Sequence, residues 1–203
     1  PARGRSPRRP GRGRVPAPMR YNESVCEPSL RERGFAMDLS AFFKMTYGLY
    51  VVSAEADGLR AGCIINTAVQ VTAEPPRVSV AVNKDNVTAR AIAQSGAFAV
   101  TAIDKTADMP YIGNFGFRSS DTYDKFEKYG CETSAVGSPY APEHACALIA
   151  CRLIDTVDVG THYLFIGEAV DAQVLSDEEP LTYSYYHTVL KGKTPPKASS
   201  YQA

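Results

Sequence analysis

Short runs of β-branched and aromatic residues, separated by turn-forming residues, are the feature that most limits the folds open to this chain. Side chains of these kinds pack well on a pleated surface, so such runs favour β-strands. Asp57-Gly58 and residues 159–162 are the expected hairpin turns, and residues 105–145 are expected to be mostly loop with a short helix. The expected strands are residues 47–56, 60–76, 77–82, 97–104, 145–160 and 161–176. The pattern predicts a mostly β protein, an antiparallel Greek-key barrel with a few short helices.

Helical periodicity is confined to two short segments. Residues 37–46 suit a short N-terminal helix. In the second segment, residues 86–96, the Asn86 side chain can accept hydrogen bonds from the free N–H groups of the first helical turn. Gly96 can adopt the left-handed backbone conformation that often ends a helix. Ala89 and Ile92 then share its apolar face. Because helices are so few, and because the chain has no Rossmann, P-loop or G-x-S-x-G motif, a doubly wound α/β fold is excluded.

The charge distribution predicts two parts. The 203 residues carry a formal net charge of zero, but residues 1–36 carry +6 and residues 37–203 carry −6. The first part is rich in Arg, Pro and Gly and cannot bury enough surface to fold. It can be a basic arm for nucleic acid or an acidic partner, a transit peptide, or a disordered extension that need not belong to the natural protein; we favour the last. The acidic second part, the predicted domain, argues against nucleic-acid binding.

The cysteines and hydropathy point to a cytoplasmic protein. No run of 18 apolar residues is present, so no membrane span is expected, and the start of the chain lacks the apolar core of a signal peptide. No C-x-x-C pair or zinc-finger spacing occurs, so we expect reduced thiols and no metal. The cysteines are Cys26, Cys63, Cys131, Cys146 and Cys151.

Four separated motifs, in order, resemble the flavin reductase family. They are YGLYVVSA with GCIINTAVQVTAEPPRVSVAVNKDNVTARAI, then FGFRSSDTYDKF, GTHYLFIGEAVDA and DEEPLTYSYYHTVLKGKTPPKASSY. The resemblance covers about residues 37–203 and looks closest to the branch of flavoredoxins and flavin-reductase–rubredoxin fusions. The chain departs from the pattern at Ser120, where Gly is common, and at Thr122 and Thr161, where Asp is frequent. If the protein is of the fusion type, its rubredoxin domain is missing from this sequence, since that domain needs two C-x-x-C pairs.

The resemblance implies an FMN-binding split barrel that takes electrons from NAD(P)H. It also implies a homodimer, with FMN near the dimer seam, and a flavin, ferric or protein acceptor. A rubredoxin- or ferredoxin-like protein is the implied redox partner. Nicotinamide would fold over the flavin without a Rossmann unit. An electron carrier of flavoredoxin type, with tightly bound FMN and a protein donor, is the main alternative. A non-redox β-barrel binding module is a third hypothesis.

The first site implied by the resemblance is a strand along the flavin ring and ribityl chain. Its backbone can meet the polar ring edge, while small apolar side chains such as Cys63 cover one face. Cys63 has no resolving partner in sequence, so an apolar lining role is preferred to a redox thiol. An ordinary core strand is the structural alternative. The expected contacts are Gly62, Cys63, Ile64, Ile65, Asn66, Thr67, Gln70, Val71 and Thr72.

The second site is a phosphate loop at a helix N-terminus, formed by Asn83, Lys84, Asn86 and Thr88. Free N–H groups and the helix dipole favour an anion there, and Lys84 adds a positive charge. The alternative is a capped helix beside a solvated lysine.

His162 is the candidate catalytic residue. It lies at a hairpin turn in the family's histidine position, where it would orient flavin and nicotinamide or stabilise charge rather than act as a general base. A turn histidine without a role is the alternative.

Two further elements complete the predicted site. Lys125 and Phe126, with Asp124, form the family's D-K-F element beside the flavin, although a surface helix shows the same residue types. Tyr185 is taken as a cofactor contact from the group that includes Tyr183 and Tyr186, which can equally pack at an interface.

Overall fold

The computed structural model describes residues 38–194 and residue 198. The predicted basic extension at residues 1–36 lies outside the described residues. Seven strands form one antiparallel sheet in the order β2-β1-β5-β8-β9-β4-β3. The strands are β1 (Tyr50–Ala56), β2 (Leu59–Ile65), β3 (Val69–Ala73), β4 (Pro76–Asn83), β5 (Ala97–Ile103), β8 (Ala145–Asp158) and β9 (His162–Val174). The prediction of a mostly β, antiparallel protein is confirmed.

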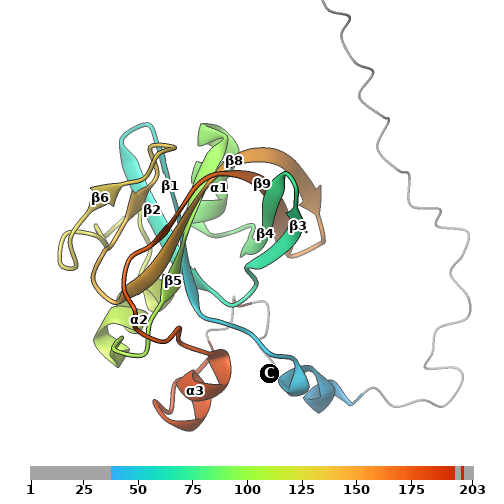
Figure 1. Cartoon of the computed structure of the whole chain (residues 1–203), viewed down its shortest axis with the longest axis vertical. Helices are drawn as coiled ribbons and strands as arrows, with labels where there is room; N and C mark the ends of the chain where they lie inside the picture. The colour runs from blue at the N-terminus through green and yellow to red at the C-terminus, as the bar shows by residue number, and fades with distance from the viewer. Residues whose placement is uncertain (1–37, 195–197, 199–203) are drawn as a thin grey trace, which may run out of the picture. The chain divides into compact units, whose positions relative to one another are not determined.

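The sheet curls, with β1 and β2 on one side, β3 and β4 on the other, and the long β8 and β9 arching between them (Figure 1). Where β2 gives way to β3, the Thr67 hydroxyl donates to the Ala81 carbonyl at 3.0 Å. The same hydroxyl accepts from the Ala81 N–H at 3.2 Å. A side chain thus supplies the hydrogen bonds that join the end of β2 to β4. This join is why the predicted single strand at residues 60–76 is two strands.

The two predicted hairpins form as expected. Asp57 and Gly58 have φ of 50° and 76°, the positive values that a type I′ turn needs between β1 and β2. At the other hairpin, β8 pairs with β9 as far as Asp158 and Tyr163, and Gly160 has φ of 93° in the turn. The turns predicted from the sequence therefore account for the pairing of β1 with β2 and of β8 with β9, four of the seven strands of the sheet.

Three α-helices and one 3-10 helix accompany the sheet in the described part of the chain. They are α1 (Val87–Ser95), α2 (Met109–Phe117), α3 (Tyr183–Thr188) and a 3-10 helix at Leu39–Lys44, and two short strands, β6 (Glu132–Thr133) and β7 (Pro139–Tyr140), pair separately. Asn86 caps α1, because its side chain accepts from the Thr88 N–H at 2.9 Å, and Gly96 ends it with φ of 68°. Among the described residues, no helix is long and apolar enough to cross a membrane.

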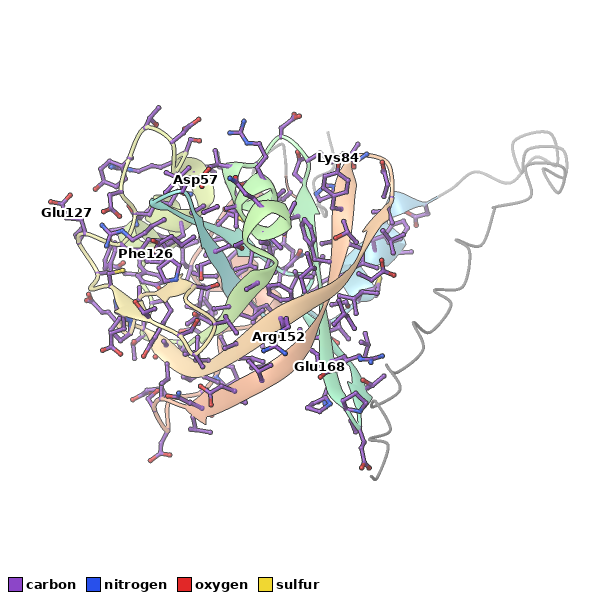
Figure 2. The ribbon with its side chains drawn as sticks, turned by 90° about the horizontal axis from the view of Figure 1, so that it is seen from above. Asp57, Lys84, Phe126, Glu127, Arg152 and Glu168 are labelled. Carbon is purple, nitrogen blue, oxygen red and sulfur yellow. The ribbon has the colours of Figure 1, made fainter. Side chains whose placement is uncertain are left out.

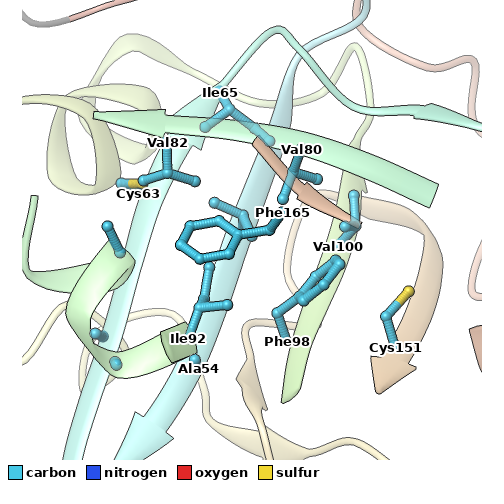
Figure 3. Close-up of a cluster of buried hydrophobic side chains, with 14 of the residues drawn as sticks. Ala54, Cys63, Ile65, Val80, Val82, Ile92, Phe98, Val100, Cys151 and Phe165 are labelled. Atoms are coloured by element: carbon cyan, nitrogen blue, oxygen red, sulfur yellow. The ribbon is translucent and has the colours of Figure 1, made fainter. Parts of the chain in front are cut away.

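The barrel core is a packed set of aliphatic and aromatic side chains. Figure 3 shows Phe165 and Phe98 at its centre, with Ile92 of α1 beside them. All three side chains are fully buried, and each contributes about 1.5–3 kcal/mol relative to an exposed state. A Cβ at Gly167 would lie 2.6 Å from the Phe98 ring, so the glycine gives that ring its space.

A second core joins α2 to the C-terminal segment. Three buried residues from distant parts of the chain complete one another's backbone hydrogen bonds: Leu49 N–H to Leu181 O at 2.9 Å, Leu181 N–H to Ile103 O at 2.7 Å, and Ile103 N–H to Leu49 O at 3.1 Å. We call this ring of bonds the clasp. Leu181 is fully buried, so this residue of the C-terminal segment belongs to the second core.

Candidate functional site

A pocket lies between the ends of β2 and β4 on one side and helices α2 and α3 on the other. The space outside protein atoms is about 610 Å³, a figure that includes open solvent at the mouth of the pocket. Its lining residues are Leu49, Cys63, Ile64, Ile65, Asn66, Ala81, Val82, Asn83, Asn86, Ile112, Gly116, Phe117, His162, Tyr183, Tyr186, Thr194 and Ala198.

One wall of the pocket is apolar and belongs to β2. Cys63 and Ile65 are buried there. Ile64 is half-buried and packs against α2, because a Cβ built on Gly116 would lie 3.6 Å from the Ile64 Cγ1 atom. Burial raises the pKa of the Cys63 thiol, and the charge of Lys125 and a bond with Thr88 offset only part of that rise. The thiol is therefore held neutral, which suits a lining role better than a reactive one.

The rim of the pocket is polar and is formed where β4, α1 and β9 meet. Asn83 ends β4 and pairs in register with His162, the first residue of β9. The Asn83 carbonyl accepts from the Asn86 N–H at 2.9 Å, which folds the chain into the N-terminus of α1. The Nδ1 atom of His162 lies 2.8 Å from the Thr161 hydroxyl. The structure thus brings together the predicted phosphate loop and the predicted catalytic histidine, which are distant in sequence.

Lys84 lies beside this rim but does not line the pocket. Its Nζ is 2.5 Å from Asp158 Oδ1 and 5.0 Å from the centre of the Tyr163 ring, so it braces the tip of the β8–β9 hairpin (Figure 2). The hydrogen bond from Lys84, followed by that from the Gly160 N–H, lowers the pKa of Asp158. The ammonium group of Lys84 thus lies between the tip of the β8–β9 hairpin and the predicted phosphate loop.

Gly62, Lys125 and Phe126 meet one another behind the β2 wall. Lys125 is 2% exposed, and its Nζ donates to the carbonyls of Gly62 at 2.6 Å and Phe115 at 3.1 Å. A Cβ at Gly62 would lie 2.9 Å from the Phe126 ring, which points into the domain while Glu127 points away from it (Figure 2). Burial lowers the pKa of Lys125. These residues fasten α2 to the outer edge of β2 and do not reach the pocket.

Other predicted contacts lie elsewhere. Gln70, Val71 and Thr72 are exposed on β3, and they do not line the pocket. The Thr67 hydroxyl serves the β2–β4 join, and Thr88 is fully buried beneath the pocket wall beside Cys63.

The tyrosines of α3 divide between two faces. Tyr183 and Tyr186 line the pocket, whereas the Tyr185 ring lies 5.5 Å from the Lys105 Nζ outside it. A spacing of three residues places side chains on one helical face, so the sequence held a signal for choosing Tyr183 with Tyr186.

Some residues that line the pocket were not predicted from the sequence. Ile112 and Gly116 lie four residues apart on α2, within a region expected to be mostly loop, and that spacing was the available signal. Ala81 and Val82 precede the phosphate loop on β4. Leu49 and Thr194 reach the pocket only through the second core, and no local pattern marks them.

Comparison with known proteins supports one family. The model of the flavin reductase like domain matches residues 42–190. A ferric-chelate reductase (NAD(P)H) of Archaeoglobus fulgidus is 46% identical over 165 residues, covering 81% of this chain and 98% of that protein. A high molecular weight rubredoxin of Moorella thermoacetica is 39% identical over 165 residues, covering 81% of this chain and 72% of its own.

Solved structures agree with this family. The flavin reductase HpaC, solved with NADP⁺, superposes with a TM-score of 0.62 at 25% identity, covering 71% of this chain and 89% of that one. Flavoredoxin from Methanosarcina acetivorans has the same fold, with a TM-score of 0.59 at 23% identity, covering 66% of this chain and 74% of its own. The curled antiparallel sheet, the pocket at its end and the match along most of its length show that the chain belongs to the flavin reductase family.

Proposed function

We propose that this chain is an NAD(P)H-dependent reductase that holds FMN in the pocket and delivers electrons to a flavin, ferric or protein acceptor. The observation that carries the proposal is the continuity of an apolar wall on β2 with a polar rim at the N-terminus of α1. A flavin mononucleotide has the same division, with an apolar ring at one end and a phosphate dianion at the other.

The residues present fit that cofactor. Ile64 and Ile65 would face the ring from β2, and Ile112 and Tyr183 would close it from the helices. Asn83 and Asn86 would take the phosphate, because the first N–H groups and the dipole of α1 favour an anion. FMN, when bound, would supply the ring that accepts a hydride from NAD(P)H and passes electrons on.

His162 would orient the reacting rings at the rim. Its backbone is fixed by pairing with Asn83, and the Thr161 hydroxyl holds its Nδ1 atom at 2.8 Å. Leu49 and Ile112 line the pocket opposite the rim and would exclude water from it. The protein's part is therefore to position and desolvate, and its own side chains need not exchange electrons.

Two relatives bear on the identity of the electron acceptor. The 46% identity to a protein named ferric-chelate reductase supports a ferric acceptor. The 39% identity to a high molecular weight rubredoxin favours the second candidate, an electron carrier that works with a small redox protein. The free thiols of the four described cysteines suit the reducing cytoplasm, where such partners and NAD(P)H occur.

A homodimer belongs to the proposal. Strand β3 ends the sheet, and all five of its residues are exposed, with Val69 at 57% and Val71 at 48%. An apolar edge strand tends to pair with another chain unless it is covered. Light scattering after size exclusion should give twice the chain mass, and replacing both valines with Lys should give the monomer.

The deciding experiment is anaerobic reduction of the purified protein. We expect bound oxidised flavin, bleaching on addition of NADH or NADPH, and return of the yellow colour with Fe(III)-EDTA or excess FMN. Protein that binds no flavin contradicts the proposal. Bleaching by reduced ferredoxin, with no response to either nicotinamide, decides for the electron carrier.

A matched pair of variants tests the location of the site. Ile64→Asn places a polar group in the pocket wall and should weaken FMN binding at least tenfold, whereas Val174→Asn at the exposed end of β9 should leave the affinity unchanged. The opposite order would move the site away from the β2 wall.

A further inference from the structure

Lys125 holds its ammonium group behind two walls of the pocket without facing the pocket itself. Its Nζ donates to the Gly62 carbonyl at 2.6 Å and to the Phe115 carbonyl at 3.1 Å. Each of these two residues directly precedes a residue that lines the pocket, Cys63 on β2 and Gly116 on α2. The ammonium group therefore lies one residue behind the pocket lining, at the place where β2 and α2 meet.

The positive charge of Lys125 has no buried counterion. The side chain is 2% exposed, and among the described residues no carboxylate forms an ion pair with it. Asp121 on the same loop is exposed, and Asp124 pairs with Arg60. Burial raises the pKa of the Cys63 thiol, so the thiol stays neutral and does not cancel the cation.

A buried charge of this kind acts at a distance. The interior of a protein screens a charge much less than water and salt screen a charge at the surface. The two carbonyls offset part of the cost of desolvating the ammonium group, but they carry no net charge. Lys125 therefore makes the adjoining part of the pocket more favourable for a ligand that carries negative charge than for the same ligand without it.

We propose that Lys125 stabilises the negative charge that a flavin ring gains on reduction, and so raises the reduction potential of flavin bound in the pocket. This rests on the proposed function, in which the ring lies against the β2 wall and takes a hydride from NAD(P)H. The hydride brings two electrons and one proton to the neutral ring, which becomes an anion while the nicotinamide ring becomes a cation. Lys125 touches neither ring, so it is a positioning residue that acts by its charge.

The effect should be about tenfold. A unit charge about 10 Å away, in a medium with an effective dielectric constant of about 20, changes an equilibrium constant by roughly that factor. Removing the charge should therefore raise the ratio of the Kd of reduced FMN to the Kd of oxidised FMN about tenfold. For a two-electron couple, a tenfold rise in this ratio lowers the midpoint potential by about 30 mV.

Three variants test the proposal by anaerobic titration of the bound FMN against a dye of known potential. Lys125→Met removes the charge and should lower the midpoint potential by about 30 mV. Its Kd for oxidised FMN should change by about threefold at most, because the oxidised ring is neutral. Lys125→Arg keeps the charge and should keep the wild-type potential. Lys128→Met, at an exposed lysine of the same loop, is the matched control and should keep it as well.

The potential separates an electrostatic role from a structural one. A lysine that only fastens α2 to β2 would affect the binding of oxidised and reduced FMN alike, so its loss would leave the potential unchanged. A wild-type potential in Lys125→Met therefore overturns the inference, and so does an equal fall in Lys125→Arg. Protein that binds no FMN overturns the proposed function as well.

A second measurement needs no variant and applies even if Lys125→Met does not fold. The N1 atom of the reduced ring carries the added negative charge. In the wild-type protein this atom should therefore lose its proton at a lower pH than in free reduced FMN. Nitrogen-15 NMR of labelled, fully reduced FMN on the protein measures this titration. An N1 atom that titrates at the same pH as in free reduced FMN, or at a higher one, overturns the inference.

Discussion

At the scale of single residues, two lysines that the sequence presents alike have opposite surroundings. Lys84 is partly exposed and pairs with Asp158, whereas Lys125 is buried and its Nζ donates to two backbone carbonyls. The motif resemblance assigned both to the cofactor. A sequence cannot separate them, because burial depends on which distant strand or loop covers the side chain.

Lys125 should contribute to stability more than to binding. Lys125→Met leaves the carbonyls of Gly62 and Phe115 without their donor, so we expect a loss of about 1–3 kcal/mol in unfolding free energy by urea titration. Lys128→Met, at an exposed lysine, should change it by less than about 0.5 kcal/mol. Equal losses in both variants would contradict a buried fastening role.

The same lysine predicts a pH dependence. Burial lowers its pKa below the ordinary 10.5, so the native state releases the proton before the unfolded state does. As pH rises from the lowered pKa toward 10.5, the unfolded state holds more protons and stability increases. The difference in unfolding free energy between wild type and Lys125→Met should therefore grow with pH over that window.

Lys84 tests the phosphate loop. Lys84→Met should weaken FMN binding by about tenfold or less, since one partly screened charge is lost. In the same variant the pKa of Asp158 should rise toward its ordinary value of 3.8, because the hydrogen bond from Lys84 is what lowers it most. NMR titration of the carboxyl groups measures the Asp158 pKa, and flavin fluorescence measures the FMN affinity. A restored Asp158 pKa with unchanged affinity would leave Lys84 as a hairpin brace only.

His162 tests the rim. His162→Ala should slow reduction of bound flavin by NAD(P)H at least tenfold while changing the FMN Kd by only a few-fold, because the residue orients the reacting groups and is one of several contacts. His162→Gln keeps a hydrogen-bonding side chain without charge. Recovery in the Gln variant identifies orientation as the role, and continued loss identifies charge. Stopped-flow absorbance measures both, and wild-type rates in the Ala variant would contradict either role.

At the scale of elements, the sequence was sufficient to predict the structures that are formed by residues close together along the chain. The Asp57-Gly58 turn, the Asn86 and Gly96 caps and the β8–β9 hairpin all follow from residues a few positions apart. The join between β2 and β4 was not predictable in this way. It depends on Thr67 meeting Ala81, and a threonine in a strand looks the same whether its hydroxyl faces solvent, a ligand or another strand.

Thr67→Val separates these roles. The variant keeps the shape but leaves the Ala81 N–H and carbonyl unpaired, so we expect a loss of about 1–3 kcal/mol in unfolding free energy. FMN affinity of the folded fraction should change less than threefold. A large loss of affinity at full stability would instead support the cofactor contact that the motif resemblance implied.

At the scale of the whole molecule, family motifs were sufficient for the architecture and for part of the pocket lining. The β2 wall, the phosphate loop and His162 come from motifs that are close in sequence to the residues they serve. The walls from α2, α3 and Thr194 were not assigned, because they meet the barrel only through the second core. Their positions are set by tertiary packing, which composition and spacing do not encode.

FMN should stabilise the whole domain if the pocket is its site. At one hundred times Kd, binding adds about 2.7 kcal/mol, which should raise the Tm by roughly 5–10 °C for a domain of this size. Riboflavin at the same concentration should raise it less, since it lacks the phosphate for the α1 N-terminus. Equal shifts with both ligands would remove the phosphate loop from the site.

The clasp between Leu49, Ile103 and Leu181 also bears on how the domain folds. These contacts join the beginning, middle and end of the domain, so their loops close late and at high entropic cost. A chain emerging from the ribosome can form the β1–β2 hairpin and α1 long before residue 181 appears. The helix that carries Tyr183 and Tyr186 follows the clasp directly, so the pocket becomes complete only when the last part of the domain has been made.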